Sequence, residues 1–227
     1  MAVINASKAG YVAGQSSTTF ATARQNASTV VSAPSTAQTV SIRYAATAGR
    51  GSLTHAFTRT FLYFDTSGLT GTISDASLNI EGATNHAIDV AVFKSTAFGG
   101  DGGTALATSD FFSTIDFSTT YFAGQDWVPT TNNIDLNSAA MVSIKNDDAF
   151  ICALVESTGD YSNTAATSAT SNIAGIDFGT TITLTYTEAG AASGPANLTS
   201  YNGIAKASIT SINGITMANI TTLNGIS

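Results

Sequence analysis

The sequence predicts an all-β chain: an antiparallel, jelly-roll-like β-sandwich followed by a short repetitive C-terminal β tail. Charged residues make up 10% of the chain, against about a quarter in ordinary soluble domains. Thr, Ser, Ala, Gly and Asn replace the missing charge, and the β-branched residues Thr, Val and Ile pack well on a pleated sheet. Short apolar segments separated by Gly, Asn and Asp turns are typical of an antiparallel sandwich.

The strongest strand pattern spans Phe57–Phe64. Its apolar side chains fall on both faces, with Phe57, Phe61 and Tyr63 on one and Leu62 and Phe64 on the other. A strand that is apolar on both faces is expected near the centre of a sheet, where both faces are covered. We therefore expect Phe61 and Phe64 in the core.

The remaining elements follow the same alternation. Residues 1–50 are polar, with weak strand patterns at Tyr11–Val12 and Thr39–Tyr44. Further strands are predicted at Ile73–Ile80, Ile88–Phe93, Phe150–Val155 and Ile182–Tyr186, with Leu78 and Ile80 in the core. A long loop is predicted over Phe98–Trp127 and a short helix near Asn137–Ile144. In the strand at Ile182–Tyr186, apolar residues alternate with threonines, which indicates one buried face.

Charge and hydropathy exclude several partners. The net charge is −7, with eight Lys and Arg spread through the chain, so a concentrated basic surface for nucleic acid is not expected. No apolar run approaches the roughly 20 residues of a membrane span, and the Met start lacks the pattern of a secretory signal. We expect a soluble chain without a membrane partner.

No residue pattern indicates an enzyme. The sequence holds no nucleophile elbow, P-loop or dinucleotide fingerprint. The single cysteine, Cys152, lies in an apolar run and is interpreted as a buried thiol rather than a nucleophile. His55 and His86 stand apart from any zinc-ligand spacing.

Two weaker binding hypotheses remain open. No cofactor is expected, although Asp101 and the pair Asp147–Asp148 are candidates for calcium ligands through loop oxygens. The aromatic residues Tyr121, Phe122 and Trp127 are candidates for glycan contact, the alternative being core aromatics and loop anchors.

The C-terminal tail repeats every eleven residues. The chain divides into a sandwich domain at residues 1–188, a flexible linker at 189–197 and the repeat tail at 198–227. Asn-Gly recurs at 202–203, 213–214 and 224–225. Large apolar residues recur beside it: Leu198, Tyr201, Ile204, Ile209, Ile212, Ile215, Ile220, Leu223 and Ile226.

Short strands joined by Asn-Gly turns are the favoured reading of this tail, because Asn-Gly is a strong tight-turn signal. A right-handed helical coil would also suit an eleven-residue period, but glycine in every repeat opposes helix. A disordered end is the other alternative, and the regular isoleucine spacing opposes it. Three short repeats cannot bury these residues alone. We expect the tail to anchor the chain or join copies of it.

The body resembles the DNRLRE-type and related carbohydrate-binding-module-like β-sandwiches. The resemblance spans about residues 8–188 and rests on Arg24–Asn26, Arg59–Leu69, Ile73–Ile80 and Leu184–Tyr186. The first of these segments is shorter than in the family. The resemblance implies a β-sandwich.

The repeats resemble the S-I-N-G-I type endings of structural proteins of tailed bacteriophages. This resemblance covers residues 198–227. It implies a non-enzymatic virion component, such as a capsid decoration, head fibre or tail appendage, with other virion proteins as partners and a homotrimer as the usual fibre symmetry. The alternative is a carbohydrate-binding module or adhesin of a secreted or cell-surface protein. A host-surface glycan is a candidate partner in either case.

Overall fold

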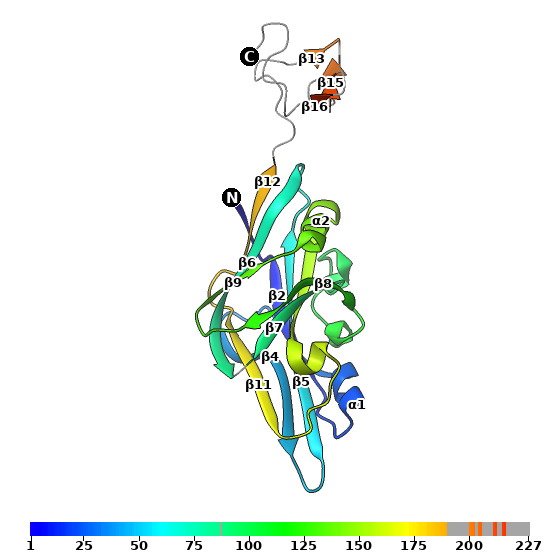
Figure 1. Ribbon diagram of the computed structural model, residues 1–227, viewed down its shortest axis with the longest axis vertical. Coiled ribbons are helices and arrows are strands. Elements are labelled where there is room, and N and C mark those ends of the chain that lie inside the picture. Colours follow the sequence, from blue (N-terminus) through cyan, green and yellow to red (C-terminus); the bar gives the residue numbers. More distant parts are fainter. Residues whose placement is uncertain (87, 190–199, 203, 206–210, 213–214, 217–227) are drawn as a thin grey trace.

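The computed structural model describes residues 1–86, 88–189, 200–202, 204–205, 211–212 and 215–216. Within them the chain is all-β, and every strand pairing is antiparallel, which confirms the predicted fold class. Figure 1 shows long strands running along the body, with the helical segments gathered on one side of it.

Twelve strands build the body. They are β1 (Ala2–Asn5), β2 (Lys8–Gly14), β3 (Ala27–Ser32), β4 (Ala37–Ala48), β5 (Leu53–Asp65), β6 (Thr72–His86), β7 (Asp89–Ser95), β8 (Ile115–Asp126), β9 (Thr131–Asp135), β10 (Ala149–Glu156), β11 (Thr170–Asp177) and β12 (Thr183–Ala189). The helical segments are α1 (Phe20–Gln25), α2 (Ser138–Asn146), the 3₁₀ turns η1 (Phe98–Gly100) and η2 (Thr108–Phe111), and a π-helical turn η3 (Ser157–Tyr161).

One hydrogen-bonded sheet curls over itself to make the sandwich. Its order is β1-β12-β6-β11-β4-β5-β10-β7-β8, with β2 joining β3 to β5, and β9 added to β6. The pairing shifts register in β11 between Ala174 and Ile176, and such bulges bend a sheet locally. Strands β6 and β12 therefore share a core with β5, β7 and β10, although β11 and β4 separate them in the sheet.

The main core lies inside this curl. It holds three of the four predicted core residues, Phe64, Leu78 and Ile80, together with Leu62, each fully buried. The fourth predicted core residue, Phe61, is also fully buried but belongs to the second core. It also holds the inward residues of the other predicted strands, including Val90, Val92, Phe150, Leu154, Leu184 and Tyr186. The alternation in the sequence thus marked the buried face of these predicted strands correctly.

A second core covers the outer face of the central strands. Phe57, Phe61, Phe93 and Val155 belong to it, and Tyr63 packs against it. Residues of α1, η1 and η2 cover this face, among them Ala23, Phe98 and Phe111. The prediction that Phe57–Phe64 is buried on both faces is confirmed, and β5 lies between β4 and β10 within the sheet.

The helix prediction is confirmed and one loop prediction is wrong in part. Helix α2 begins after Asn137, whose side chain accepts hydrogen bonds from the backbone N–H groups of Ala139 and Ala140. The predicted loop Phe98–Trp127 contains strand β8. Pairing of β8 with β7 shifts register three times, and a strand that irregular does not present the clean alternation used to find the others.

The described tail residues form short strand pairs. Ser200–Tyr201 (β13) pairs with Ile204–Ala205 (β14), and Ser211–Ile212 (β15) pairs with Ile215–Thr216 (β16). Each pair flanks an Asn-Gly step, and Asn202 has a φ of 51°, as a tight hairpin turn requires. These described residues are extended rather than helical. In the described part of the chain, no helix has the length and apolarity of a membrane crossing.

Candidate functional site: a polar groove above a buried ion network

A buried ion pair lies beneath the outer surface of β5. Arg59 of β5 and Asp160 of η3 are both fully buried. The Arg59 guanidinium donates two hydrogen bonds to the Asp160 carboxylate, from Nε to Oδ2 at 2.7 Å and from Nη2 to Oδ1 at 2.6 Å. This two-pronged geometry is the strong form of an arginine–carboxylate pair. Burying it nevertheless costs several kcal/mol per ion in desolvation, so the network is a weak explanation of stability by itself.

The remaining donors of Arg59 bind two separate surface segments. Nη1 donates to the carbonyl oxygen of Phe111 at 2.5 Å, and Nη2 donates to the carbonyl oxygen of Arg24 at 2.9 Å. Arg24 belongs to α1 and Phe111 to η2. One buried side chain therefore fixes the positions of two backbone segments that are distant in the sequence.

Glu156 holds the turn that presents Asp160. It is fully buried at the end of β10, and its carboxylate accepts hydrogen bonds from the backbone N–H groups of Thr158, Gly159 and Asp160. Asn172 of β11 donates to the same carboxylate at 2.8 Å. These bonds satisfy N–H groups that a helix start leaves unpaired. The turn η3 is thus anchored to the sheet.

Arg24 completes the network from the side of α1. Its Nε donates to the backbone oxygen of Asp160 at 2.8 Å and to Oδ1 at 3.1 Å. Its guanidinium carbon lies 4.7 Å from the ring centre of Phe117 and 5.3 Å from that of Phe112, a favourable cation–π arrangement. Burial lowers the pKa of Arg24, and the nearby Asp160 opposes that effect.

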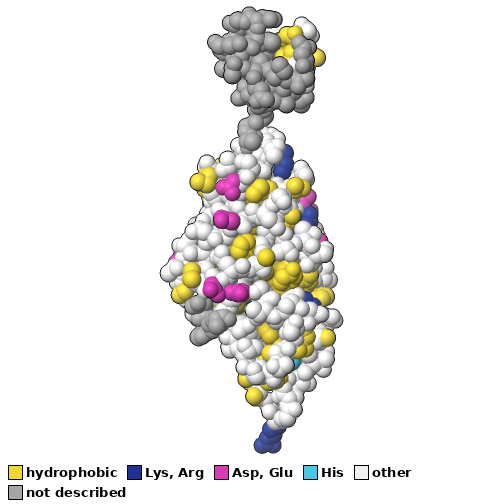
Figure 2. Space-filling model, in the orientation of Figure 1, with side chains coloured by type: hydrophobic (Ala, Val, Ile, Leu, Met, Phe, Trp, Pro, Cys, Tyr) yellow, Lys and Arg dark blue, Asp and Glu magenta, His cyan; other side chains and the backbone are white. Residues whose placement is uncertain are grey.

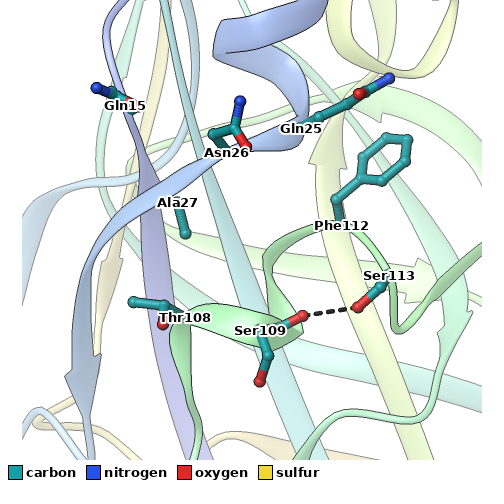
Figure 3. A pocket seen from close by; sticks show the side chains of 8 residues that line it. All are labelled: Gln15, Gln25, Asn26, Ala27, Thr108, Ser109, Phe112 and Ser113. Carbon is teal, nitrogen blue, oxygen red and sulfur yellow. Dashed lines mark hydrogen bonds between the residues drawn. The ribbon is translucent and has the colours of Figure 1, made fainter.

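A polar groove lies where these segments meet at the surface. Figure 3 shows its lining: the carboxamides Gln15, Gln25 and Asn26, the hydroxyl residues Thr108, Ser109 and Ser113, the ring of Phe112, and Ala27. Its volume is about 510 Å³. None of these lining residues is charged, in keeping with Figure 2, where neutral side chains dominate the face shown.

Most polar side chains that line the groove make no hydrogen bond to the described part of the protein. Gln15, Gln25, Thr108 and Ser109 are exposed, and their side chains make no hydrogen bond within the described part of the chain. Asn26 uses its Nδ2 to donate to the carbonyl oxygen of Thr22 at 3.0 Å, which leaves its Oδ1 facing water. The groove therefore offers neutral hydrogen-bond donors and acceptors beside one aromatic ring.

The backbone around the groove is fixed by close packing. A Cβ atom at Gly14 would lie 2.6 Å from a ring carbon of Phe111 and 3.0 Å from the carbonyl oxygen of Ala23. The chain can approach this closely only at glycine. Gln15 follows directly, and its backbone N–H donates to the carbonyl oxygen of Asn26 at 2.7 Å, so these two lining residues are held side by side.

The structure places the aromatic residues considered for glycan contact mainly in the interior. Tyr121 and Trp127 are 1% exposed. The Tyr121 hydroxyl donates to Ser143 at 2.7 Å, and the Trp127 indole donates to the carbonyl oxygen of Gly175 at 3.1 Å. Phe122 is half-buried against the main core. Neither Tyr121 nor Trp127 offers a ring face to a ligand at the surface, because both are packed inside the fold.

Five of the nine tail residues, Leu198, Ile209, Ile220, Leu223 and Ile226, lie outside the described residues. Among the others, Tyr201 and Ile204 are cross-strand partners, as are Ile212 and Ile215. Ile204 is 54% exposed and Ile212 is 9% exposed. The two pairs occupy equivalent positions in successive repeats.

Packing or hydrogen bonding engages Cys152 and His55, two of the reactive groups considered from the sequence. Cys152 is fully buried, and burial raises the pKa of its thiol. Burial lowers the pKa of His55, whose Nδ1 lies 3.2 Å from the Tyr44 hydroxyl. The side chain of His86 is outside what the structure describes.

Two of the acidic residues considered for calcium are engaged by groups of the protein itself. Asp101 accepts from the backbone N–H of Gly103 at 2.6 Å, and Asp147 pairs with Lys94 at 2.6 Å. Burial opposes ionisation of Asp147, but Lys94 and Ser143 together lower its pKa. Within the described residues, no three His, Cys, Asp or Glu side chains gather as a metal site would need.

Comparison with known proteins adds no relative. No protein-family model matches the chain, and no curated protein sequence matches it. The resemblances to DNRLRE-type sandwiches and to phage repeat endings therefore stay predictions.

Sequence reasoning did not find the groove, although one signal for the ion network was present. Arg59 interrupts an otherwise aromatic and apolar strand, and an arginine buried at such a position requires an acidic partner. The partner itself, Asp160, lies in a polar loop about which the local pattern says nothing.

Proposed function

We propose that the chain is a non-enzymatic virion structural protein of a tailed phage, with the sandwich facing solvent and the repeats joining it to other chains. The observation that carries this proposal is the pair of equivalent hairpins in the tail. Tyr201↔Ile204 and Ile212↔Ile215 have the same register around Asn-Gly steps eleven residues apart. The repeat is thus a structural unit as well as a sequence pattern.

Such hairpins need a surface to cover them. A lone two-stranded hairpin is marginally stable in water, and repeat units gain stability from their neighbours. Ile204 remains 54% exposed, which leaves apolar surface for another chain. Homotrimeric wrapping of three tails, or docking onto a capsid or tail protein, would cover it, with the Asn-Gly turns outside.

The buried chemistry supports a role without catalysis. Asp160 and Glu156, the fully buried acids, are engaged by arginines and by backbone N–H groups. Neither carboxylate is placed to exchange protons with a ligand in the groove, because arginine and main-chain partners hold it beneath the surface.

Light scattering and particle incorporation test the proposal. The intact chain should form a trimer or enter virions, and a chain ending at Ala189 should do neither. A second variant, Tyr201→Ser with Ile212→Ser, keeps the length and removes one apolar residue from each described hairpin. The matched control, Ser200→Thr with Ser211→Thr, changes exposed residues of the same strands and should assemble normally. Equal assembly and incorporation by all four chains would refute the proposal.

The alternative, a carbohydrate-binding module or adhesin, makes a different prediction about location. It places the chain on a cell surface or in secreted material rather than in particles. Mass spectrometry of purified virions separates the two, because a structural protein is recovered in fixed proportion to the capsid protein.

A further inference from the structure

We propose that the groove between α1, η2 and the end of β2 binds a neutral saccharide. Its lining combines amide groups, hydroxyl groups and one aromatic ring without a charged side chain. Amide side chains carry both donors and acceptors, so each can bind a hydroxyl that is itself donor and acceptor. The Phe112 ring, half-buried beside them, offers an apolar surface on which the C–H face of a sugar ring can pack.

The arrangement of the polar groups suits a polyol. Gln15, Gln25 and Asn26 extend from one wall, and Thr108 and Ser109 lie on the opposite wall, as Figure 3 shows. A ligand lying across the groove would be within the region lined by both the amides and the hydroxyl groups. Adjacent hydroxyls of a sugar ring supply the matching groups, whereas an apolar ligand would leave these amides without partners.

The charge distribution selects a neutral ligand. A phosphate, sulfate or nucleic-acid ligand needs exposed Lys or Arg, and none lines the groove. Arg59 is fully buried and Arg24 is 91% buried by side chain, and both are bound to Asp160. Neither guanidinium therefore lines the groove, and both are directed toward the buried Asp160 rather than toward a ligand.

The volume and the rigidity of the walls support binding. About 510 Å³ falls within the roughly 300–1,000 Å³ of small-molecule sites. Arg59 holds the backbone oxygens of Arg24 and Phe111, the residues directly before Gln25 and Phe112. A groove held in one conformation loses less entropy when it binds a ligand. This gives the costly buried ion network a role that stability does not explain.

The test uses the full chain and a defined panel of oligosaccharides. Hexasaccharides of glucose (α- and β-linked), mannose, xylose and galactose are titrated, in parallel with and without EDTA, while backbone and side-chain amide signals are followed by NMR. Oligogalacturonate and a sulfated oligosaccharide are the charged comparisons. We expect at least one neutral sugar to saturate shifts of Gln15, Gln25 and Asn26 with a millimolar Kd.

Paired variants connect binding to the groove. Gln15→Ala with Gln25→Ala should weaken that Kd at least fivefold, because both side chains are exposed and their loss leaves the fold intact. Asn133→Ala removes an exposed amide on β9 and should leave it unchanged. Phe112→Tyr keeps the ring and should retain binding.

Four results would overturn the inference: no saturable shift with any neutral sugar, tighter binding of a charged one, dependence on a cation removed by EDTA, or indifference to the glutamine variant. The inference is independent of the virion proposal. The glutamine variant should still assemble and enter particles, so failure of one proposal is distinguishable from failure of the other.

Discussion

Replacing Asp160 by Asn tests the ion network most directly. The carboxylate accepts three hydrogen bonds from two arginines, at 2.6, 2.7 and 3.1 Å. Asparagine keeps one acceptor oxygen and turns an N–H₂ group toward guanidinium donors. Arg59 is then a fully buried cation without a counter-ion, and removing one partner of a buried pair typically costs about 3–5 kcal/mol of unfolding free energy.

This loss should be large in a thermal experiment. In a domain of this size, each kcal/mol corresponds to about 2–4 °C in Tm, so Asp160→Asn should lower Tm by about 6–20 °C. Differential scanning calorimetry and urea denaturation measure the Tm and the unfolding free energy. The NMR signals of Gln25 and Phe112 should also shift, because Arg59 holds the residues directly before them.

The chain contains its own control for this experiment. Asp147 pairs with Lys94 at 2.6 Å, with both side chains 37% exposed, and exposed pairs contribute about 0–1 kcal/mol. Asp147→Asn should therefore change Tm little, and added salt should reduce its effect further. If Asp160→Asn and Asp147→Asn lower Tm equally, the reasoning about buried charge is refuted.

Three further predictions concern packing and pH. Phe64→Ala should lower the unfolding free energy in urea by about 3–5 kcal/mol, and an unchanged midpoint would contradict the main core. Gly159→Ala places a Cβ atom 2.0 Å from the Tyr44 ring. Because that ring is buried, calorimetry should show a loss of about 1–3 kcal/mol of unfolding free energy. The control Gly68→Ala should show no such loss, because no atom lies within 4 Å of the added Cβ. A hydrogen bond with Asp126, then burial, raises the pKa of Asp89 above its ordinary value of 3.8. The protonated form therefore stabilises the fold at low pH, and this stabilisation is lost as pH rises through the raised pKa. Asp89→Asn should consequently have a larger unfolding free energy than the natural chain at neutral pH and lose that advantage below about pH 4. Urea denaturation of both proteins at several pH values measures this difference, and a difference that stays constant across pH would contradict the assignment.

The buried faces of the regular strands were predictable from the sequence, because successive side chains of a strand point to opposite faces and apolar residues therefore recur at every second position. In Phe57–Phe64 the side chains alternate between the two cores as the period of two requires. Helix α2 also depends on a local signal, because the side chain of Asn137 caps its first turn. Strand β8 escaped prediction because its repeated register shifts break the period.

The groove and the network beneath it were decided by the tertiary structure. Arg59 binds a carboxylate 101 residues away, and Arg24 binds the same carboxylate across 136 residues. Side-chain alternation predicts which face of a strand is buried. It does not predict which turn packs against that face. The composition of the sequence determined that this chain is a hydroxyl-rich β protein with few charged residues. The folding of the sheet determined where three distant segments meet, because contacts of that span depend on the path of the whole chain.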